Sequence, residues 1–208
     1  MTQGLWITFE GGDGSGKSTQ AQQLAQWLRD HGRTVVHTRE PGGSEVGVLI
    51  RDIVLHHRGE IAPRAEALLY AADRAHHVAT VVRPALARGE VVIQDRYLDS
   101  SVAYQGAGRV LDAAQVRDLS LWAAEGALPD LTVLLDLEPA AARARLDSAD
   151  KPFDRLEAER EDFHTRVREA FLALAAAEPE RFLIVDATQS PATIADVIQR
   201  RLEILLAQ

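Results

Sequence analysis

The sequence predicts an α/β fold in three layers, a five-stranded parallel sheet with helices on both faces. Short apolar segments with strand character alternate with longer segments whose apolar residues recur at helical spacing. A glycine-rich loop joins the first predicted strand to the first predicted helix, which places a candidate ligand site at the carboxyl ends of the strands. The predicted strands are Leu5–Phe9, Thr34–Thr38, Val91–Gln94, Leu131–Leu135 and Phe182–Val185.

Residues 11–18, with the sequence GGDGSGKS, match the phosphate-loop pattern G-x-x-x-x-G-K-[S/T], which indicates a P-loop NTPase-type fold. Backbone N–H groups of such a loop can surround a phosphate, and the helix N-terminus adds a positive dipole end. Lys17 can reach the β- and γ-phosphates, and Ser18 can hold Mg²⁺. An ordinary glycine-rich turn needs no Lys-Ser pair at its end. The expected ATP-binding residues of the loop are Gly11, Gly12, Asp13, Gly14, Ser15, Gly16, Lys17, Ser18 and Thr19.

The composition narrows the class of protein. The chain has 208 residues, of which 46% are hydrophobic, and no cysteine. We expect one domain, residues 1–208, with a short lid at about 143–155, and no disulfide framework. The net charge of −8 argues against a general nucleic-acid binder, and no apolar run is long enough for a membrane helix. Without a signal-peptide pattern, we expect a cytoplasmic protein.

Charged residues follow two of the predicted strands. Arg39 lies just beyond the second strand, where open α/β sheets place their ligands, although a solvated loop charge would have the same pattern. Asp95 and Arg96 follow the third strand. A carboxylate in this position is a natural partner for Mg²⁺ or its waters. The planar fork of Arg96 can bridge two phosphoryl groups.

The helix predicted from Ala65 to Ala79 contains a second candidate site. Tyr70 and Arg74 are four residues apart and therefore adjacent on the helix, where they could receive a flat base and a phosphate. A surface cation–π pair is the alternative. The neighbouring pairs His56-His57 and His76-His77 point to different sides of a helix, so we assign them structural roles.

The second half of the chain contains four further predicted helices. The segment from Leu111 to Leu128 could be a core helix or a subunit interface, and a long helix is expected from about Leu156 to Glu178. Between Ala140–Leu146 and the long helix lies a polar break that contains Lys151, one of only two lysines in the chain. A charged flap at this end of the sheet is typical of a closing lid. Ser190 is expected to cap the last helix.

Four sequence blocks in this order resemble the thymidylate kinase (dTMP kinase) family over nearly the whole chain. The blocks are Glu10–Thr19, Thr38–Gly43, Leu68–Arg74 and Asp95–Gly106. The resemblance implies that Asp13 approaches the sugar 3′-hydroxyl of the acceptor and that Arg39, Arg74 and Arg96 hold its phosphate. It further implies that Tyr70, where the family usually has Phe, stacks on thymine, that Ser101 and Gln105 lie near the base, and that Tyr104 crowds the 2′ position.

Family members differ in the source of a catalytic cation. Some carry a basic residue at the position of Gly14, whereas others, which this chain resembles, take the cation from the lid. We therefore expect Lys151 to be this cation, with Arg155 as the second candidate. Arg143 and the loop around Gln189 are expected to border the adenine.

The resulting hypothesis is transfer of the γ-phosphoryl group of ATP to dTMP, giving dTDP, with Lys17, Arg96, Asp95 and Lys151 as catalytic residues. Mg²⁺ would be held by Ser18 and Asp95, and a homodimer is implied by the family. One alternative is a deoxynucleoside kinase, which acts on a 5′-hydroxyl and could use Glu10 as its base. The other is a non-catalytic nucleotide-binding module.

Overall fold

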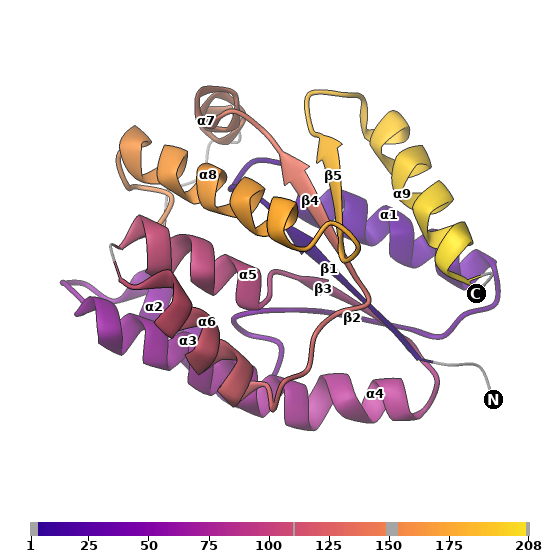
Figure 1. Cartoon of the computed structure of the whole chain (residues 1–208), viewed down its shortest axis with the longest axis horizontal. Coiled ribbons are helices and arrows are strands. Elements are labelled where there is room, and N and C mark those ends of the chain that lie inside the picture. The colour runs from indigo at the N-terminus through magenta and orange to yellow at the C-terminus, as the bar shows by residue number, and fades with distance from the viewer. Residues whose placement is uncertain (1–3, 110, 149–153, 207–208) are drawn as a thin grey trace.

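The structure, a computed structural model, describes residues 4–109, 111–148 and 154–206. Its five strands form one parallel sheet in the order β2-β3-β1-β4-β5. Helices pack on both faces of this sheet, as Figure 1 shows, so the predicted three-layer fold is confirmed. The strands are β1 (Leu5–Glu10), β2 (Val35–Arg39), β3 (Val91–Asp95), β4 (Leu131–Asp136) and β5 (Phe182–Asp186).

The helices begin and end close to the predicted positions in most cases. Two segments, η1 and η2, are π-helical and continue α3 and α5. The elements are α1 (Lys17–Asp30), α2 (Glu45–His56), α3 (Pro63–His77), η1 (Val78–Val82), α4 (Arg83–Ala87), α5 (Leu98–Ser101), η2 (Val102–Gly108), α6 (Ala113–Ala123), α7 (Pro139–Asp147), α8 (Glu161–Ala177) and α9 (Pro191–Leu206).

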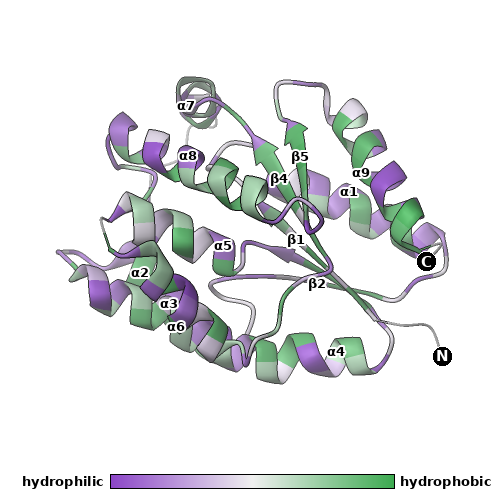
Figure 2. Ribbon diagram, in the orientation of Figure 1, coloured by the Kyte–Doolittle hydropathy of each residue, from purple (hydrophilic) through white to green (hydrophobic). Residues whose placement is uncertain are grey.

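The two faces of the sheet are chemically different. Ile7 and Phe9 of β1 point to the face covered by α1 and α9, where they join a cluster of apolar side chains with Leu24, Leu28 and Ile198. Figure 2 shows the strands as mainly hydrophobic and the helices as hydrophobic on one stripe only. Because side chains alternate along a strand, Trp6, Thr8 and Glu10 of β1 point to the opposite face. That face also buries polar side chains, and it supports the functional site.

Two predicted helices are shorter than expected. The helix predicted from Leu111 begins at Ala113, because the carboxylate of Asp112 accepts hydrogen bonds from the N–H groups of Ala114 and Gln115 at 2.9 and 3.1 Å. It ends at Ala123, before Glu125 and Gly126, which both have positive φ.

The long helix predicted from about Leu156 to Glu178 is present as α8, but its predicted start was wrong. Residues 155–158 form a turn, and α8 begins only at Glu161. The carboxylate of Asp154 accepts from the N–H groups of Leu156 and Glu157, and the Glu157 carboxylate accepts from the N–H of Asp154. These side-chain bonds compete with helical backbone bonds and stabilise a separate turn.

The start of α9 agrees with the prediction, since Ser190 Oγ accepts from the N–H of Thr193 at 3.1 Å.

Among the described residues, none of the helices combines the length and the apolar character that crossing a membrane would require.

Candidate active site

The glycine loop lies between β1 and α1 and curls around its own lysine. Gly11, Gly14 and Gly16 have φ values of 129°, 78° and 96°, which residues with a Cβ rarely adopt. Lys17 Nζ donates to the carbonyl oxygens of Gly11 at 3.1 Å and Gly12 at 2.8 Å. Burial, together with the charge of Arg96, lowers the pKa of Lys17. The lysine therefore lies where a phosphate bound by the loop would meet it.

Ser18 and Asp95 lie side by side at the carboxyl ends of β1 and β3. Ser18 Oγ donates to Asp95 Oδ2 at 2.9 Å, which brings together the two residues predicted as metal ligands. The described residues contain no group of three or more His, Cys, Asp or Glu side chains that could hold a metal by themselves. A hydroxyl and a carboxylate fit Mg²⁺, which usually binds through few side chains and completes its shell with phosphates and water.

A cavity opens beside the glycine loop, and residues from distant parts of the chain line it. Asp13 lines it from the loop, and α3 and η2 line it from the other side. Seven of the eight predicted substrate-binding residues line this cavity: Asp13, Tyr70, Arg74, Arg96, Ser101, Tyr104 and Gln105.

Arg96 connects the cavity to the glycine loop. It has a φ of 66°, an uncommon value for a residue other than glycine, and this turn directs its side chain toward the loop. Its guanidinium donates to Gly11 O at 3.2 Å, Ser100 Oγ at 3.0 Å, Asp13 Oδ1 at 2.5 Å and Tyr104 Oη at 3.1 Å. The side chain is thus held in place by four groups before any ligand binds.

The charges around Arg96 shift the pKa values of their neighbours. Burial alone would raise the pKa of Asp13, but the charges of Arg96 and Lys17 outweigh burial and lower it. Asp13 Oδ2 accepts from Tyr104 Oη at 3.1 Å. Burial, opposed only in part by Arg96, raises the pKa of Tyr104. The Asp13 carboxylate is therefore ionised and the Tyr104 hydroxyl is protonated at neutral pH.

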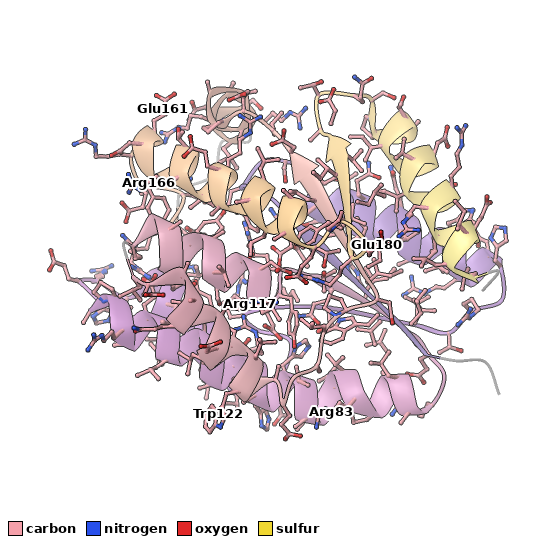
Figure 3. The ribbon with its side chains drawn as sticks, viewed as in Figure 1. Arg83, Arg117, Trp122, Glu161, Arg166 and Glu180 are labelled. Carbon is pink, nitrogen blue, oxygen red and sulfur yellow. The ribbon has the colours of Figure 1, made fainter. Side chains whose placement is uncertain are left out.

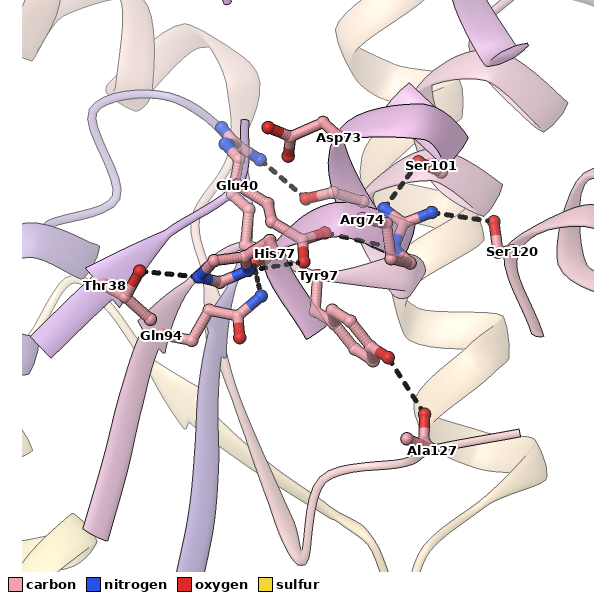
Figure 4. A network of polar contacts seen from close by, with 12 residues as sticks. Thr38, Glu40, Asp73, Arg74, His77, Gln94, Tyr97, Ser101, Ser120 and Ala127 are labelled. Atoms are coloured by element: carbon pink, nitrogen blue, oxygen red, sulfur yellow. Dashed lines mark hydrogen bonds and ion pairs between the residues drawn. The ribbon is translucent and has the colours of Figure 1, made fainter. Parts of the chain in front are cut away.

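Arg74 is buried below the cavity, and three elements hold it (Figure 4). Its guanidinium donates at 3.0 Å to Glu40 Oε2, Ser101 Oγ and Ser120 Oγ. The guanidinium lies over the ring of Tyr97, 5.3 Å from its centroid. The alternative of a surface cation–π pair between Tyr70 and Arg74 is excluded, because Arg74 is only 1% exposed.

His77 and the polar residues around it hold the Glu40 side chain in place. His77 Nδ1 lies 2.9 Å from Glu40 Oε1, and His77 Nε2 lies 2.7 Å from Thr38 Oγ1. Asp73 Oδ1 accepts from the N–H of Gly42 at 3.1 Å, and burial together with Glu40 raises the pKa of Asp73 to about 6. The fully buried His77 therefore has the structural role that the sequence predicted.

Arg39 lies apart from the other two arginines of the predicted phosphate site. It is exposed, and it lines a neighbouring cavity together with Ser18 and Asp95. Arg51 of α2 lines the main cavity instead, where it donates to Pro41 O at 3.0 Å. Sequence reasoning missed Arg51 because no motif surrounds it, although it is the only arginine within α2.

The structure describes one of the two residues predicted as the catalytic cation. Lys151 lies outside the described residues. Arg155 donates to Val54 O at 2.9 Å and to Glu66, so it is anchored to α2 and α3. This anchoring makes it a poor second candidate for the catalytic cation.

On the donor side, Arg143 pairs with Asp147, whereas Arg145 donates to Gly14 O at 3.4 Å and to Ala187 O at 2.8 Å. Arg145 therefore joins the glycine loop to the loop that carries Gln189. Gln189 donates to Asp186, and both Thr19 and Gln189 are exposed.

Glu10 is fully buried behind the glycine loop. Its carboxylate accepts from the N–H groups of Tyr97 at 2.7 Å and Ser100 at 3.2 Å, and from Ser100 Oγ at 2.6 Å. Burial, together with the charge of Asp99, raises the pKa of Glu10 to about 7. These contacts anchor the start of α5 and leave Glu10 outside the set of cavity-lining residues, which argues against a role as base for a 5′-hydroxyl.

The chain is similar to known thymidylate kinases in sequence and in fold. The sequence model of the thymidylate kinase family matches residues 9–198. A thymidylate kinase of Clavibacter sepedonicus is 72% identical over 204 residues, covering 98% of this chain and 97% of that protein. One from Cutibacterium acnes is 50% identical over 204 residues, covering 98% of both chains.

A crystal structure of thymidylate kinase from Ehrlichia chaffeensis superimposes with a TM-score of 0.77 at 28% sequence identity, covering 98% of this chain and 99% of that one. The resemblance therefore extends through sequence and fold over almost the full length. The chain belongs to the thymidylate kinase family.

Proposed function

We propose that the chain transfers the γ-phosphoryl group of ATP to dTMP, giving dTDP and ADP, as a step of dTTP synthesis in the cytoplasm, where both nucleotides are available. The observation that carries the proposal is the position of Asp13. It belongs to the glycine loop, it lines the cavity, and Arg96 binds it. A triphosphate in the loop and a monophosphate in the cavity would therefore meet end to end.

The contacts divide the cavity into two ends. Tyr70 and Arg74 are one helical turn apart on α3, and Arg74 bonds Ser101, which lies one turn from Gln105. We assign these four residues to the base, with the Tyr70 ring as its stacking surface. Arg96, which bonds the glycine loop, and Arg51, which also lines the cavity, are assigned to the acceptor phosphate. This assignment moves Arg74 from the phosphate to the base.

The reaction needs alignment and charge neutralisation more than proton abstraction. The attacking atom is a phosphate oxygen of dTMP, which is already anionic, so the residues need only position it and balance charge. Lys17 and Arg96 are both held against the loop by the bonds described above, and both donate to Gly11 O. Lys151 would complete the set from the lid, a role that rests on the sequence alone.

Ser18 and Asp95 would hold Mg²⁺, directly or through water, and the bound ion would neutralise charge on the β- and γ-phosphates. Arg39 lines the neighbouring cavity together with Ser18 and Asp95, so we assign it to the side of the phosphates where Mg²⁺ would bind. Arg145, with the loop around Gln189, is assigned to the adenine in place of Arg143.

The sugar would lie beside Asp13 and Tyr104. The ionised Asp13 carboxylate can accept a hydrogen bond from the 3′-hydroxyl. The Tyr104 ring is buried and held through its hydroxyl by Asp13 and Arg96, so it cannot move aside for a 2′-hydroxyl. This arrangement favours a deoxyribonucleotide.

A coupled assay with ATP and four acceptors, dTMP, dUMP, UMP and thymidine, tests the proposal. dTMP should be the best acceptor, and dUMP should be poorer by about 10–200-fold in kcat/KM, the range expected for one methyl group in a fitted pocket. Turnover of thymidine in preference to dTMP would overturn the proposal in favour of a deoxynucleoside kinase. ATP binding without turnover of any acceptor would favour a non-catalytic module.

We also propose that the chain forms a homodimer through the surface of α2, α3 and α6. Large apolar side chains are exposed on all three helices: Val46, Val48, Leu49, Ile53, Leu68 and Trp122. Trp122 is 79% exposed, and Figure 3 shows it projecting from the surface beside α6. Contiguous exposed apolar residues mark interaction surfaces. Sedimentation of the wild type and of Leu49→Asp should show a dimer and a monomer, respectively.

A further inference from the structure

A buried carboxylate on α3 lies next to the cavity and has no part in the mechanism above. Glu66 is 0% exposed and bonds side chains from two other regions of the chain. Its Oε1 accepts from Gln105 Nε2 at 2.9 Å and from Arg109 Nε at 3.5 Å, and its Oε2 accepts from Arg155. The two guanidinium groups compensate the negative charge that burial would otherwise penalise.

Glu66 decides which end of the Gln105 amide faces the cavity. The oxygen and nitrogen of a glutamine amide have nearly the same shape, so their placement follows from the bonds that they make. An ionised carboxylate can only accept hydrogen bonds. The NH₂ group of Gln105 must therefore face Glu66. No described residue donates to Gln105 Oε1, and Gln105 lines the cavity, so the cavity receives a carbonyl oxygen.

The opposite polarity comes from Arg74. A guanidinium can only donate, and Arg74 lines the same cavity with its orientation fixed by Glu40, Ser101 and Ser120. The base end of the cavity thus offers one obligate donor and one acceptor. Thymine and uracil present an N3–H donor beside the O4 acceptor. Cytosine presents the reverse, an N3 acceptor beside a 4-amino donor.

We propose that Glu66 is a specificity-determining positioning residue, which holds Gln105 with its carbonyl oxygen toward the base and so selects 4-oxo pyrimidines against 4-amino pyrimidines. The inference rests on the proposed function, since it takes the cavity as the site of the acceptor base. Glu66 itself does not touch the base. A cytosine in the cavity would leave buried donors and acceptors unpaired, and such mismatches give strong discrimination.

The test is kcat/KM of the full-length protein for dTMP, dUMP and dCMP, with Glu66→Gln as the main variant. An amide at position 66 can donate as well as accept, so the Gln105 amide is free to turn over. The dCMP:dTMP ratio should rise about 10-fold or more. The dUMP:dTMP ratio should stay within about twofold, because both bases have the same hydrogen-bonding edge.

Two controls separate this role from a structural one. Glu159→Gln makes the same chemical change at a carboxylate that also binds Arg109 but does not contact Gln105, and it should leave both ratios unchanged. Glu66→Asp changes the shape but keeps an acceptor-only group, so it should discriminate against dCMP better than Glu66→Gln does. A purely structural role predicts the reverse order, because the isosteric amide disturbs packing less.

Equal loss of kcat/KM for all three acceptors in Glu66→Gln would overturn the inference, and so would equal changes in the dUMP and dCMP ratios. If Glu66→Gln does not fold, Gln105→Met provides the test, and an unchanged dCMP:dTMP ratio there overturns the inference. These failures differ from failure of the proposed function, in which the wild type itself would show no turnover of dTMP.

Discussion

The two halves of the site are built differently. In the acceptor half, Arg74 and Arg96 form hydrogen bonds to side chains from several parts of the chain, and the Arg74 side chain is buried. In the donor half, Ser18, Thr19 and Gln189 are exposed, and among the described residues Arg145 bonds two backbone carbonyls. The acceptor half is thus rigid before binding, whereas the donor half offers mostly backbone groups and open space.

This difference indicates that the two halves bind their substrates in different ways. A rigid acceptor half can select its nucleotide by shape and hydrogen bonding, because its groups do not move to suit a wrong ligand. In the proposed mechanism, the ATP phosphates, a bound Mg²⁺ and the lid would complete the open donor half, and they would assemble the charge-neutralising set only when both substrates are present. Four predictions follow, from the largest expected effect to the smallest.

The lid cation should have the largest effect. Lys151→Ala should lower kcat by about 10³-fold, which corresponds to about 4 kcal/mol, as expected for a cation that stabilises the transferring group. Single-turnover assays with saturating ATP and dTMP measure it. Arg160→Ala, which removes an exposed positive charge nine residues further along the chain, is the matched control and should leave kcat almost unchanged. A Lys151 variant within twofold of the wild type would remove the lid from the mechanism.

The rigidity of the acceptor half should depend on a buried ion pair below α5. Arg181 donates to both oxygens of Asp99, at 2.7 and 2.8 Å, and both side chains are buried. Arg181→Ala should lower the free energy of unfolding by about 3 kcal/mol, because Asp99 is left buried without its partner. Urea denaturation measures the change, with Arg200→Ala, at an exposed arginine, as the control. A loss below about 1 kcal/mol would mean that α5 does not need this anchor.

Glu10, between the two halves, should make stability depend on pH. Its folded-state pKa of about 7 exceeds the unfolded value of 4.5, so the folded state binds the proton more tightly between these pH values. The contribution of Glu10 to stability is therefore fully present below pH 4.5 and is lost as pH rises through 7. Glu10→Gln, which mimics the protonated form, should gain about 1–3 kcal/mol relative to the wild type between pH 4.5 and 8. The free energy of unfolding of both proteins, measured at a series of pH values, tests this prediction. A difference between the two proteins that does not change with pH would contradict it.

The donor half should show the smallest effect. Arg145→Ala should raise the KM for ATP by about fivefold, the equivalent of about 1 kcal/mol, and leave the KM for dTMP unchanged. Arg143→Ala should change the KM for ATP less, because Arg143 forms an ion pair with Asp147 on its own helix. Equal effects of the two variants, or a larger effect of Arg143→Ala, would restore the assignment made from the sequence.

Local patterns predicted most of the fold and much of the site. All five strands and the phosphate loop came from apolar runs and one motif, because these features depend on residues close together in the chain. The predicted start of the long helix at Leu156 was wrong, also for a local reason. Its apolar spacing is helical, but Asp154 and Glu157 bind backbone N–H groups and form a separate turn.

Arg51 and Arg39 show where sequence reasoning stops. Both are arginines near the end of β2, and only the packing of α2 against α3 brings Arg51 to the cavity while Arg39 remains exposed. A similar limit applies to Arg143 and Arg145. They are two residues apart on a helix, so they point to different sides, and the spacing alone cannot tell which side meets the glycine loop.

The sequence by itself determined the order of the elements, the family and the phosphate-binding loop, because each is encoded by contiguous residues whose backbone preferences and chemistry act locally. Only the tertiary structure decided which arginines share the cavity, that Arg155 is anchored to Glu66, and which way the Gln105 amide faces. Those outcomes depend on contacts between residues tens of positions apart. Such contacts form only when the sheet brings its helices together and burial favours the pairing of polar groups.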